Sequence, residues 1–358
     1  MTRYIGIDLG KYETTAAEII NGVANISRVP SVVAPQYTTY EKIRQQSLVE
    51  GLENSSKHIS VNGLHWISGP MAWKNQNAVI RLDPERFTSD PMRAIIFLAL
   101  DGMGITSEDF AIYFAVPYNL TTDPIEYETL LKKLQDIYLG QHHVAIDGVH
   151  KIVKISQIGM EAQPKLAIFG AMFDDQMKWK MDGRASTDDF IIYDHGFGDL
   201  AVVTIRNLKI DDDATEEREV GMSNAAKILI KLLQLEYKNR LNLFDADALI
   251  RQAVIAKNLN GSAPQPTVIN AQINGATKDV ADQAMRALNQ YLSTPLGFAH
   301  EKTGLQNNAC KIMVGGGAHA LHGPLQEAIE GEIMMDGEPS TTVARGAAKV
   351  AKKKFSRG

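Results

Sequence analysis

The sequence predicts an α/β protein made of two related domains, and three observations lead to this fold class. The chain has 358 residues, about twice the roughly 150 residues of an ordinary domain. Stretches with β-strand patterns alternate with amphipathic helical stretches along most of its length. The order strand, Asp-x-Gly, strand occurs at Asp8 and again at Asp194, which indicates an internal duplication.

The composition is typical of a globular protein in a reducing compartment. Hydrophobic residues make up 44% and charged residues 22%, and the net charge of −5 lacks the basic excess of a direct nucleic-acid binder. Cys310 is the only cysteine, so no internal disulfide can form, and we expect a cytoplasmic protein. We expect no signal peptide and no membrane span, because the longest apolar run, residues 94–100, is far shorter than the roughly 20 residues required.

The first half of the chain begins with an antiparallel meander. A short β-rich run at residues 4–7 stops at Asp8-Leu9-Gly10, and Asn21-Gly22 then separates two further β-rich runs. Asn-Gly between such runs is a strong hairpin signal, which argues against a parallel βαβ opening. Residues 30–90 show weaker patterns, with short strands such as residues 65–68 and polar loops. After them we expect a helix from Pro91 to Leu100, a strand at 110–116, a helix at 127–138, strands within 144–158 and a helix at 166–173.

The second half repeats this order with longer helices. A buried-type strand at residues 190–193 runs into Asp194-His195-Gly196, and Gly221 opens an amphipathic helix. A strand near 311–314 stops at the triplet Gly315-Gly316-Gly317. The remaining expected elements are strands at 200–205, 217–220 and 333–335, helices at 247–257 and 278–292 with a loop at 261–266 between them, a helix after the triplet, and a closing helix at 342–353.

Three glycine-bearing turns at strand ends carry the candidate chemistry. Glycine is needed where backbone N–H groups approach phosphate without a Cβ in the way. The carboxylates of Asp8 and Asp194 would repel phosphate directly, but each can hold Mg²⁺ through water, and two carboxylates from two half-chains could share one metal ion. A single Asp-x-Gly is more often an ordinary tight turn, and a glycine triplet is more often a plain loop. Their order, spacing and flanking strands together form the stronger signal.

These turns resemble the nucleotide-binding loops of the actin, heat-shock chaperone and sugar kinase superfamily. Residues 5–10 resemble its first phosphate loop, residues 192–198 its second phosphate loop, and residues 312–318 its adenosine loop. Residues 114–117 and 343–347 resemble the two segments that connect the domains. Within the superfamily the chain is most similar to the ParM-type actins of bacteria and archaea, since chaperones and sugar kinases are normally longer.

The resemblance implies an actin-like fold of two ribonuclease H-like domains. Domain I would comprise residues 1–160 with the closing helix 340–358, and domain II residues 161–339. It also implies an ATPase that binds ATP or GTP with Mg²⁺ and assembles with itself into filaments, in plasmid segregation or a prokaryotic cytoskeleton. A DNA-binding adaptor protein would be a further partner, with no direct contact to nucleic acid.

The same resemblance assigns roles to individual residues. Asp8 and Asp194 would organise the hydrated Mg²⁺ during catalysis, and Gln163, or second to it Glu161, would position the attacking water; the plain alternative is that both are surface residues. Gly221 and Asn224 would lie at the ribose and base, unless this helix start is simply capped by Ser223. The full set of expected nucleotide contacts is Asp8, Gly10, Lys11, Thr14, Asp194, Gly196, Gly198, Gly221, Asn224, Gly315, Gly316 and Gly317.

Two departures from the family pattern concern the hydrolysis rate and the metal geometry. Thr15 stands where relatives often carry lysine, and Lys11 would supply that charge instead. The second loop reads Phe197-Gly198-Asp199 where relatives tend to have Thr-Thr-Asp, so it lacks their hydroxyls. Two alternatives therefore stand beside the filament ATPase: a small-molecule kinase on the same fold, and a non-hydrolysing nucleotide sensor or scaffold. Steady ATPase activity without an acceptor would argue against both.

Overall fold

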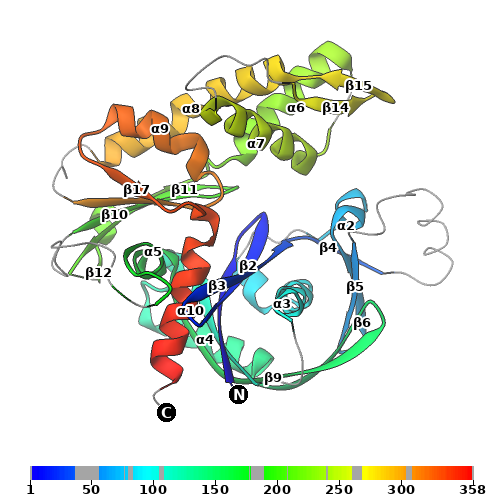
Figure 1. Cartoon of the computed structure of the whole chain (residues 1–358), viewed down its shortest axis with the longest axis vertical. Coiled ribbons are helices and arrows are strands. Elements are labelled where there is room, and N and C mark those ends of the chain that lie inside the picture. The colour runs from blue at the N-terminus through cyan, green and yellow to red at the C-terminus, as the bar shows by residue number, and fades with distance from the viewer. Residues whose placement is uncertain are drawn as a thin grey trace. The chain divides into compact units, whose positions relative to one another are not determined.

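The computed structural model describes residues 2–36, 56–75, 77–79, 84–104, 109–176, 178, 189–207, 209–238, 241–259, 268–303 and 309–356 (Figure 1). The chain forms two compact units. The first comprises Met1–Asp182 together with Thr341–Gly358, and the second comprises Gly183–Ser340. The loop expected at 261–266 lies outside the described residues.

The first unit is built on a meander that continues into a parallel sheet. Strands β1 (Thr2–Leu9), β2 (Glu13–Ile20) and β3 (Val23–Pro30) are antiparallel neighbours. Asn21 and Gly22 join β2 to β3 with φ values of 51° and 78°, so the hairpin prediction is confirmed. On its other side β1 pairs in parallel with β7 (Asp109–Val116), which pairs in parallel with β9 (Val149–Ala162).

Four more strands extend this sheet so that it curves around a central helix. They are β4 (Val33–Pro35), β5 (Lys57–Val61), β6 (Leu64–Ser68) and β8 (Gly140–Ile146), in the order β3-β2-β1-β7-β9-β8-β5-β6-β4. Figure 1 shows the strands curving around α3 (Asp90–Gly102). Every residue from Ala94 to Leu100 is at most 1% exposed. This apolar run of the sequence is therefore a helical segment buried on all sides, as expected of a segment without a polar face.

Among the other helical segments of the first unit, the one that contains Leu134 and Tyr138 joins the same hydrophobic core as α3. These segments are α2 (Pro70–Lys74), η2 (Pro84–Thr88), η3 (Tyr118–Leu120), α4 (Pro124–Tyr138), α5 (Gln163–Met172) and α10 (Thr342–Phe355). Helix α4 begins where the sequence provides both signals for a start. The Asp123 carboxylate accepts from the N–H groups of Ile125 and Glu126, and Pro124 stands in the first turn.

Glycines allow β1, α5 and α10 to approach one another backbone to backbone. A Cβ on Gly6 would lie 2.2 Å from the carbonyl oxygen of Ala344 in α10. A Cβ on Gly346 would lie 1.9 Å from the carbonyl oxygen of Leu166, and one on Gly170 would lie 2.0 Å from that of Thr342. No side chain fits at these positions, so the glycines set the distance between the three elements.

The same packing determines how far the first unit extends. We expected domain I to end at residue 160, whereas the first unit continues to Asp182 and includes α5. The buried Lys349 of α10 donates to the carbonyl oxygens of Gly170 and Phe173 at the C-terminal end of α5, 3.2 and 2.7 Å away. Arg345 of α10 donates to Asp175 at 2.8 Å. An ammonium group at a helix C-terminus complements the helix dipole, and these bonds hold α5 on α10.

The second unit repeats the strand arrangement of the first. Its sheet has the order β12 (Lys209–Ile210), β11 (Leu200–Arg206), β10 (Phe190–His195), β16 (Cys310–Val314) and β17 (Ile333–Met335), with β13 (Glu216–Arg218) also paired to β11. Strand β10 is antiparallel to β11 and parallel to β16, as β1 is antiparallel to β2 and parallel to β7. Asp194 lies opposite Val314 as Asp8 lies opposite Ala115. This equivalence supports the predicted duplication.

The helices of the second unit follow the predicted order, with one hairpin that we did not predict. They are α6 (Ser223–Tyr237), α7 (Leu243–Leu259), α8 (Ala281–Thr303) and α9 (Ala318–Ala328), with the short η4 (Asp212–Ala214) and η5 (Pro339–Thr341). Strands β14 (Asn270–Ile273) and β15 (Ala276–Asp279) precede α8, so the expected helix start at Lys278 was wrong. Asn274-Gly275 joins them with φ values of 51° and 78°, the same signal that identified the first hairpin.

Substitution of Gly346 tests the close approach of α10 and α5. We expect Gly346→Ala to destabilise the protein by about 1–3 kcal/mol or more, because the new methyl group forces the helices apart. The matched control is Gly323→Ala in α9, where a Cβ would meet no atom within 4 Å. The control should be neutral or stabilising by up to about 1 kcal/mol. Urea unfolding measures both, and equal stability of the two variants would contradict the packing argument.

Candidate functional site

In the first unit, the candidate site centres on Asp8 near the end of β1. Asp8 points to the same face of the sheet as Gly6, the face on which α10 packs. Gln163, the first residue of α5, donates a hydrogen bond from Nε2 to Asp8 Oδ1 at 2.8 Å. Burial raises the pKa of Asp8 to about 6, while the Gln163 hydrogen bond and the nearby charge of Arg86 act in the opposite direction. The fold thus joins two predicted site residues that lie 155 positions apart.

Glu161, the second candidate for positioning water, is engaged elsewhere. Its Oε1 accepts from the backbone N–H of Ala162 at 3.2 Å and from Lys165 at 3.4 Å. Its charge also adds to burial in raising the pKa of the Tyr113 and Tyr127 hydroxyls. Of the two candidates, Gln163 is therefore the one that the structure describes in contact with Asp8.

The turn after β1 is held by buried hydroxyl groups. A Cβ on Gly10 would lie 2.5 Å from the carbonyl oxygen of Glu13, so the tight turn requires glycine. Ser31 Oγ donates to the carbonyl oxygen of Gly10 at 2.6 Å, and Thr14 Oγ1 lies 2.9 Å from Ser31 Oγ. Because the Ser31 proton is used on Gly10, Thr14 must donate to Ser31. The fully buried Thr14 hydroxyl thus stabilises the turn, whereas Lys11, which lies in the turn, is partly exposed.

In the second unit, the loop after Asp194 lies directly on the start of α6. Gly196 N–H donates to the carbonyl oxygen of Asp199 at 2.9 Å and closes the loop. Its carbonyl groups then accept from the residues before and at the helix start: Gly198 O from Gly221 N at 3.2 Å, Gly196 O from Met222 N at 3.2 Å, and Phe197 O from Ser223 N at 2.7 Å. A Cβ on Gly221 would lie 2.4 Å from Asp199 N. Gly221 is thus required for this close approach.

Asn224 stabilises the segment that leads into α6. Its Nδ2 donates to the carbonyl oxygen of Glu219 at 2.8 Å, and its Oδ1 accepts from Lys227 at 3.4 Å. The alternative that Ser223 caps this helix through its side chain does not hold, because no side chain caps the helix start. Asn224 is partly exposed, and its expected contact with ribose or base stays a prediction.

The glycine triplet follows β16 and packs on the end of β10. Gly315 has a φ of 93°, and a Cβ there would lie 2.7 Å from Asp194 Oδ1. Gly315 N–H donates to the carbonyl oxygen of Pro339 at 3.0 Å, and Gly317 N–H to that of His195 at 2.8 Å. In the described part of the chain, the N–H of Gly316 has no hydrogen-bond partner. Gly316, which is partly exposed, is therefore the triplet residue that can donate to a ligand.

Sequence reasoning missed two side chains that hold this triplet. Arg251 of α7 donates from Nη1 to the carbonyl oxygen of Gly316 at 2.8 Å and from Nε to Asp247 at 2.6 Å. Asp247 is fully buried, and burial raises the pKa of its carboxyl despite the Arg251 charge. The four-residue spacing of this pair on a predicted helix was the available signal.

The second missed side chain is His195, which is fully buried between the loops. Its Nδ1 lies 2.8 Å from the carbonyl oxygen of Gly317, and its Nε2 lies 2.5 Å from the hydroxyl oxygen of Tyr291 in α8. Burial lowers the pKa of His195 to about 4, so the ring is neutral at pH 7. His195 is the variable middle residue of the Asp-x-Gly motif, and nothing in the sequence indicated a specific role for it.

Each unit, taken by itself, offers one carboxylate of the kind that magnesium binds. The described residues contain no group of three or more His, Cys, Asp or Glu side chains that could hold a metal ion. Mg²⁺ usually keeps several waters and binds through one or two carboxylates together with phosphate oxygens. Asp8 in the first unit is partly accessible, and so is Asp194 in the second unit.

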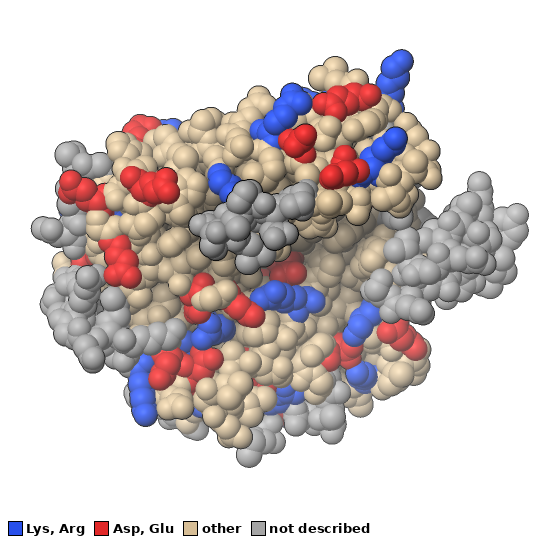
Figure 2. Space-filling view, turned by 45° about the horizontal axis from the view of Figure 1, so that its top comes forward, with Lys and Arg blue, Asp and Glu red and all other residues tan. Residues whose placement is uncertain are grey.

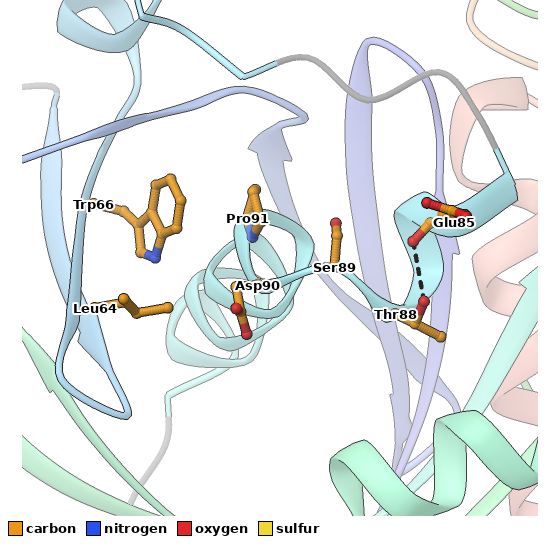
Figure 3. Close-up of a pocket in the computed structure, with 7 residues that line it drawn as sticks. All are labelled: Leu64, Trp66, Glu85, Thr88, Ser89, Asp90 and Pro91. Atoms are coloured by element: carbon orange, nitrogen blue, oxygen red, sulfur yellow. Dashed lines mark hydrogen bonds between the residues drawn. The ribbon is translucent and has the colours of Figure 1, made fainter.

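A separate cavity opens in the first unit, away from these residues. It has a volume of about 470 Å³ and is lined by Leu64, Trp66, Glu85, Thr88, Ser89, Asp90 and Pro91 (Figure 3). None of the predicted site residues lines it. On the face that Figure 2 presents, basic and acidic side chains are interspersed, so no basic patch stands out there.

Comparisons with known proteins agree with this architecture. Residues 6–165 match the family model described as actin like proteins N terminal domain. The structure of Ta0583, an archaeal actin homologue, superposes with a TM-score of 0.74 at 16% identity, over 98% of this chain and 99% of that chain. ParM of Bacillus thuringiensis with ATP gives 0.70 at 14% identity over 99% of both chains. Apo pSK41 ParM gives 0.69 at 12% identity, over 99% of this chain and 98% of that chain.

The chain therefore has an actin-like fold, and the predicted likeness to ParM-type actins is confirmed at the level of the fold. The comparison with the sequences of curated proteins gives no match. No helix in the described ranges is both long and apolar enough to cross a membrane.

The raised pKa of Asp8 predicts that this carboxylate destabilises the ligand-free protein at neutral pH. A carboxyl whose folded pKa is about 6 favours folding below its ordinary value of 3.8 and loses that contribution as the pH rises through 6. We expect Asp8→Asn, measured by urea unfolding without metal or nucleotide, to be more stable than the parent at about pH 7.5 by up to about 3 kcal/mol. The difference should almost vanish at about pH 4.

Asp175 provides the matched control, because Arg345 and Lys349 hold the pKa of that carboxyl below its usual range despite its partial burial. Asp175→Asn should therefore destabilise the protein at neutral pH, the opposite sign to Asp8→Asn. A loss of stability in Asp8→Asn at about pH 7.5 would show that the Asp8 carboxylate is stabilised by its surroundings.

Proposed function

We propose that the protein is a nucleotide-dependent, filament-forming actin-like ATPase that uses ATP or GTP with Mg²⁺. The observation that carries this proposal is the 2.8 Å hydrogen bond between Gln163 Nε2 and Asp8 Oδ1. It places the residue expected to position water beside the carboxylate expected to organise the metal. The proposal is further supported by the similarity of the fold to ParM structures with ATP, AMPPNP and ADP.

The side-chain carbonyl oxygen of Gln163 is the group available for the proposed chemistry. Its amide nitrogen donates to Asp8, which orients the side chain and leaves the carbonyl oxygen Oε1 as an acceptor. A water that donates to this oxygen is oriented for attack on a phosphoryl group, which is the task of the glutamine in nucleotide hydrolysis. Gln163 thus orients water and does not remove its proton.

The remaining residues would bind the nucleotide. When bound, Mg²⁺ neutralises phosphate charge, and Asp8 and Asp194 would each hold it through water. The turn at Gly10–Lys11 and the loop at Gly196–Gly198, in which the Gly196 N–H itself is bonded to Asp199, would offer N–H groups to phosphate oxygens. Gly316, whose N–H has no partner among the described residues, would face the nucleoside.

The cellular role would follow from assembly. Filaments require a heterologous contact between copies that does not close into a ring. Hydrolysis would shift the protein between two conformations and so weaken the contacts within the filament. We place such filaments in the cytoplasm, in plasmid segregation or a prokaryotic cytoskeleton, with a DNA-binding adaptor protein as a partner.

One observation favours a second candidate, a nucleotide sensor or scaffold with little hydrolysis. Phe197 occupies the second phosphate loop with its ring buried and stacked on Phe244, at 5.7 Å between centroids and 9° between planes. The side chain at this position therefore offers no hydroxyl group to phosphate. A loop with fewer donors would stabilise the transition state less.

Assembly tests the proposed function directly. Light scattering and pelleting at several protein concentrations, with Mg²⁺ and ATP, GTP or ADP, should show nucleotide-dependent assembly above a critical concentration. A critical concentration near 1 μM corresponds to about 8 kcal/mol per added subunit. Asp194→Ala should abolish assembly that depends on Mg²⁺ and nucleotide while the protein stays folded. Nucleotide binding without assembly would favour the sensor, or a kinase that needs an acceptor.

A pair of variants tests the assignment of Gln163 over Glu161. Gln163→Ala should lower the steady hydrolysis rate by about 100-fold or more, because the attacking water loses its orientation. Nucleotide affinity should stay nearly unchanged, since the glutamine acts on water. Glu161→Ala should have the smaller effect on the rate. A large loss of affinity in Gln163→Ala would mean that Gln163 contacts ground-state nucleotide instead.

A further inference from the structure

Three consecutive polar contacts form a buried chain within the second unit. His195 Nδ1 lies 2.8 Å from the carbonyl oxygen of Gly317, and His195 Nε2 lies 2.5 Å from Tyr291 Oη. Tyr291 Oη in turn lies 2.6 Å from the carbonyl oxygen of Val220. The rings of His195 and Tyr291 are stacked at 14° with centroids 6.1 Å apart. His195 is fully buried and Tyr291 is 3% exposed, so water does not replace any of these contacts.

The number of protons does not match the number of contacts. Both ends of the chain are carbonyl oxygens, which only accept hydrogen bonds. A neutral imidazole has one N–H and a phenol has one O–H, so two protons serve three contacts. In one arrangement, Nδ1–H donates to Gly317 and the phenol donates to Nε2. In the other, Nε2–H donates to Tyr291 and the phenol donates to Val220.

In the two arrangements, the His195 and Tyr291 side chains donate to different backbone carbonyl groups of the candidate site. With the proton on Nδ1, the carbonyl group of Gly317 is bound and that of Val220 loses its donor. With the proton on Nε2, Val220 is bound and Gly317 loses the imidazole donor. Gly317 ends the glycine triplet, and Val220 immediately precedes Gly221, two residues before α6 begins at Ser223. Gly317 O also accepts from Ala320 N–H at 3.0 Å in either case, so the tautomer of His195 decides whether the imidazole and phenol add a hydrogen bond to the triplet or to the segment before α6.

Backbone hydrogen bonds connect this choice to the exposed side of the triplet. A ligand that accepts from Gly316 N–H polarises the peptide group whose carbonyl belongs to Gly315. That carbonyl accepts from Ala318 N–H at 3.2 Å, and the carbonyl of the same Ala318 peptide group is that of Gly317. Hydrogen bonds in such a chain strengthen one another. A ligand at Gly316 therefore makes the carbonyl oxygen of Gly317 a better acceptor and favours the proton on Nδ1.

We propose that His195 and Tyr291 are positioning residues that couple the glycine triplet to the start of α6, and that a bound nucleotide shifts His195 toward its Nδ1–H tautomer. The proposal rests on the proposed function for the identity of the ligand. One proton moves from Nε2 to Nδ1 and the phenol proton turns from Val220 to Nε2, so no proton is gained or lost.

Nitrogen NMR of the full chain labelled with ¹⁵N-histidine tests this at constant neutral pH. The two ring nitrogens of His195 report which one carries the proton, and the His195→Gln spectrum assigns them by loss of their signals. Without nucleotide we expect averaged shifts from a mixture of both tautomers. Saturating Mg²⁺ and ADP should move the Nδ1 shift toward the protonated value and the Nε2 shift toward the unprotonated value.

Two tyrosine variants separate this role from a structural one. Tyr291→Phe removes the partner of Nε2, so His195 should show the Nδ1–H tautomer without nucleotide and should not change when nucleotide is added. The control is Tyr193→Phe, which removes another buried hydroxyl of the same unit, bonded at 2.6 Å to Thr303. Its His195 signals should match those of the parent. A purely structural role of Tyr291 would leave the tautomer as it is in the parent.

The outcomes also separate this proposal from the proposed function. If ADP binds, as measured by calorimetry, and the His195 shifts do not move, the coupling is refuted while the nucleotide-binding function stands. If ATP, GTP and ADP all fail to bind, the proposed function is refuted and the ligand-driven shift with it. Unaltered His195 shifts in ligand-free Tyr291→Phe would refute the relay by themselves.

Discussion

The close approach of α10 to β1 and α5 is the constraint on which the first unit depends. Gly6, Gly170 and Gly346 leave no room for a Cβ, so main chains touch where side chains normally intervene. Lys349 then supplies donors to the carbonyl groups at the end of α5, which a helix terminus otherwise leaves unsatisfied. Because α5 is held in this place, its first residue, Gln163, meets Asp8.

In the second unit, close backbone contacts of the same kind occur between loops. Gly221 and Gly317 bring three irregular segments together at distances that exclude any side chain. Irregular backbone needs hydrogen-bond partners when it is buried, and here they come from other loops and from Arg251 and His195. The loops are therefore arranged largely by backbone contacts. Gly316 N–H is a donor left over among the described residues.

The Asp8 carboxylate of the candidate site lies where its charge lowers the stability of the folded protein. Asp8 lies deep enough for burial to raise its pKa to about 6, so at neutral pH a charge is kept in a position that disfavours it. Strain of this kind is common at functional sites, where a ligand or metal ion relieves it. Thr14 shows the contrast, because its buried hydroxyl is hydrogen-bonded to Ser31 and stabilises the turn.

The sequence by itself determined the order of strands and helices, the two halves and the positions of the glycine turns. Those features follow from local rules: hydrophobic periodicity, Asn-Gly turns, and strands that stop at Asp-x-Gly. Only the tertiary structure decided that Gln163 and not Glu161 meets Asp8, that Thr14 is buried, and that His195 and Arg251 hold the glycine triplet. These outcomes depend on contacts between residues far apart in the chain, and such contacts are set by how closely elements pack, which no local pattern records.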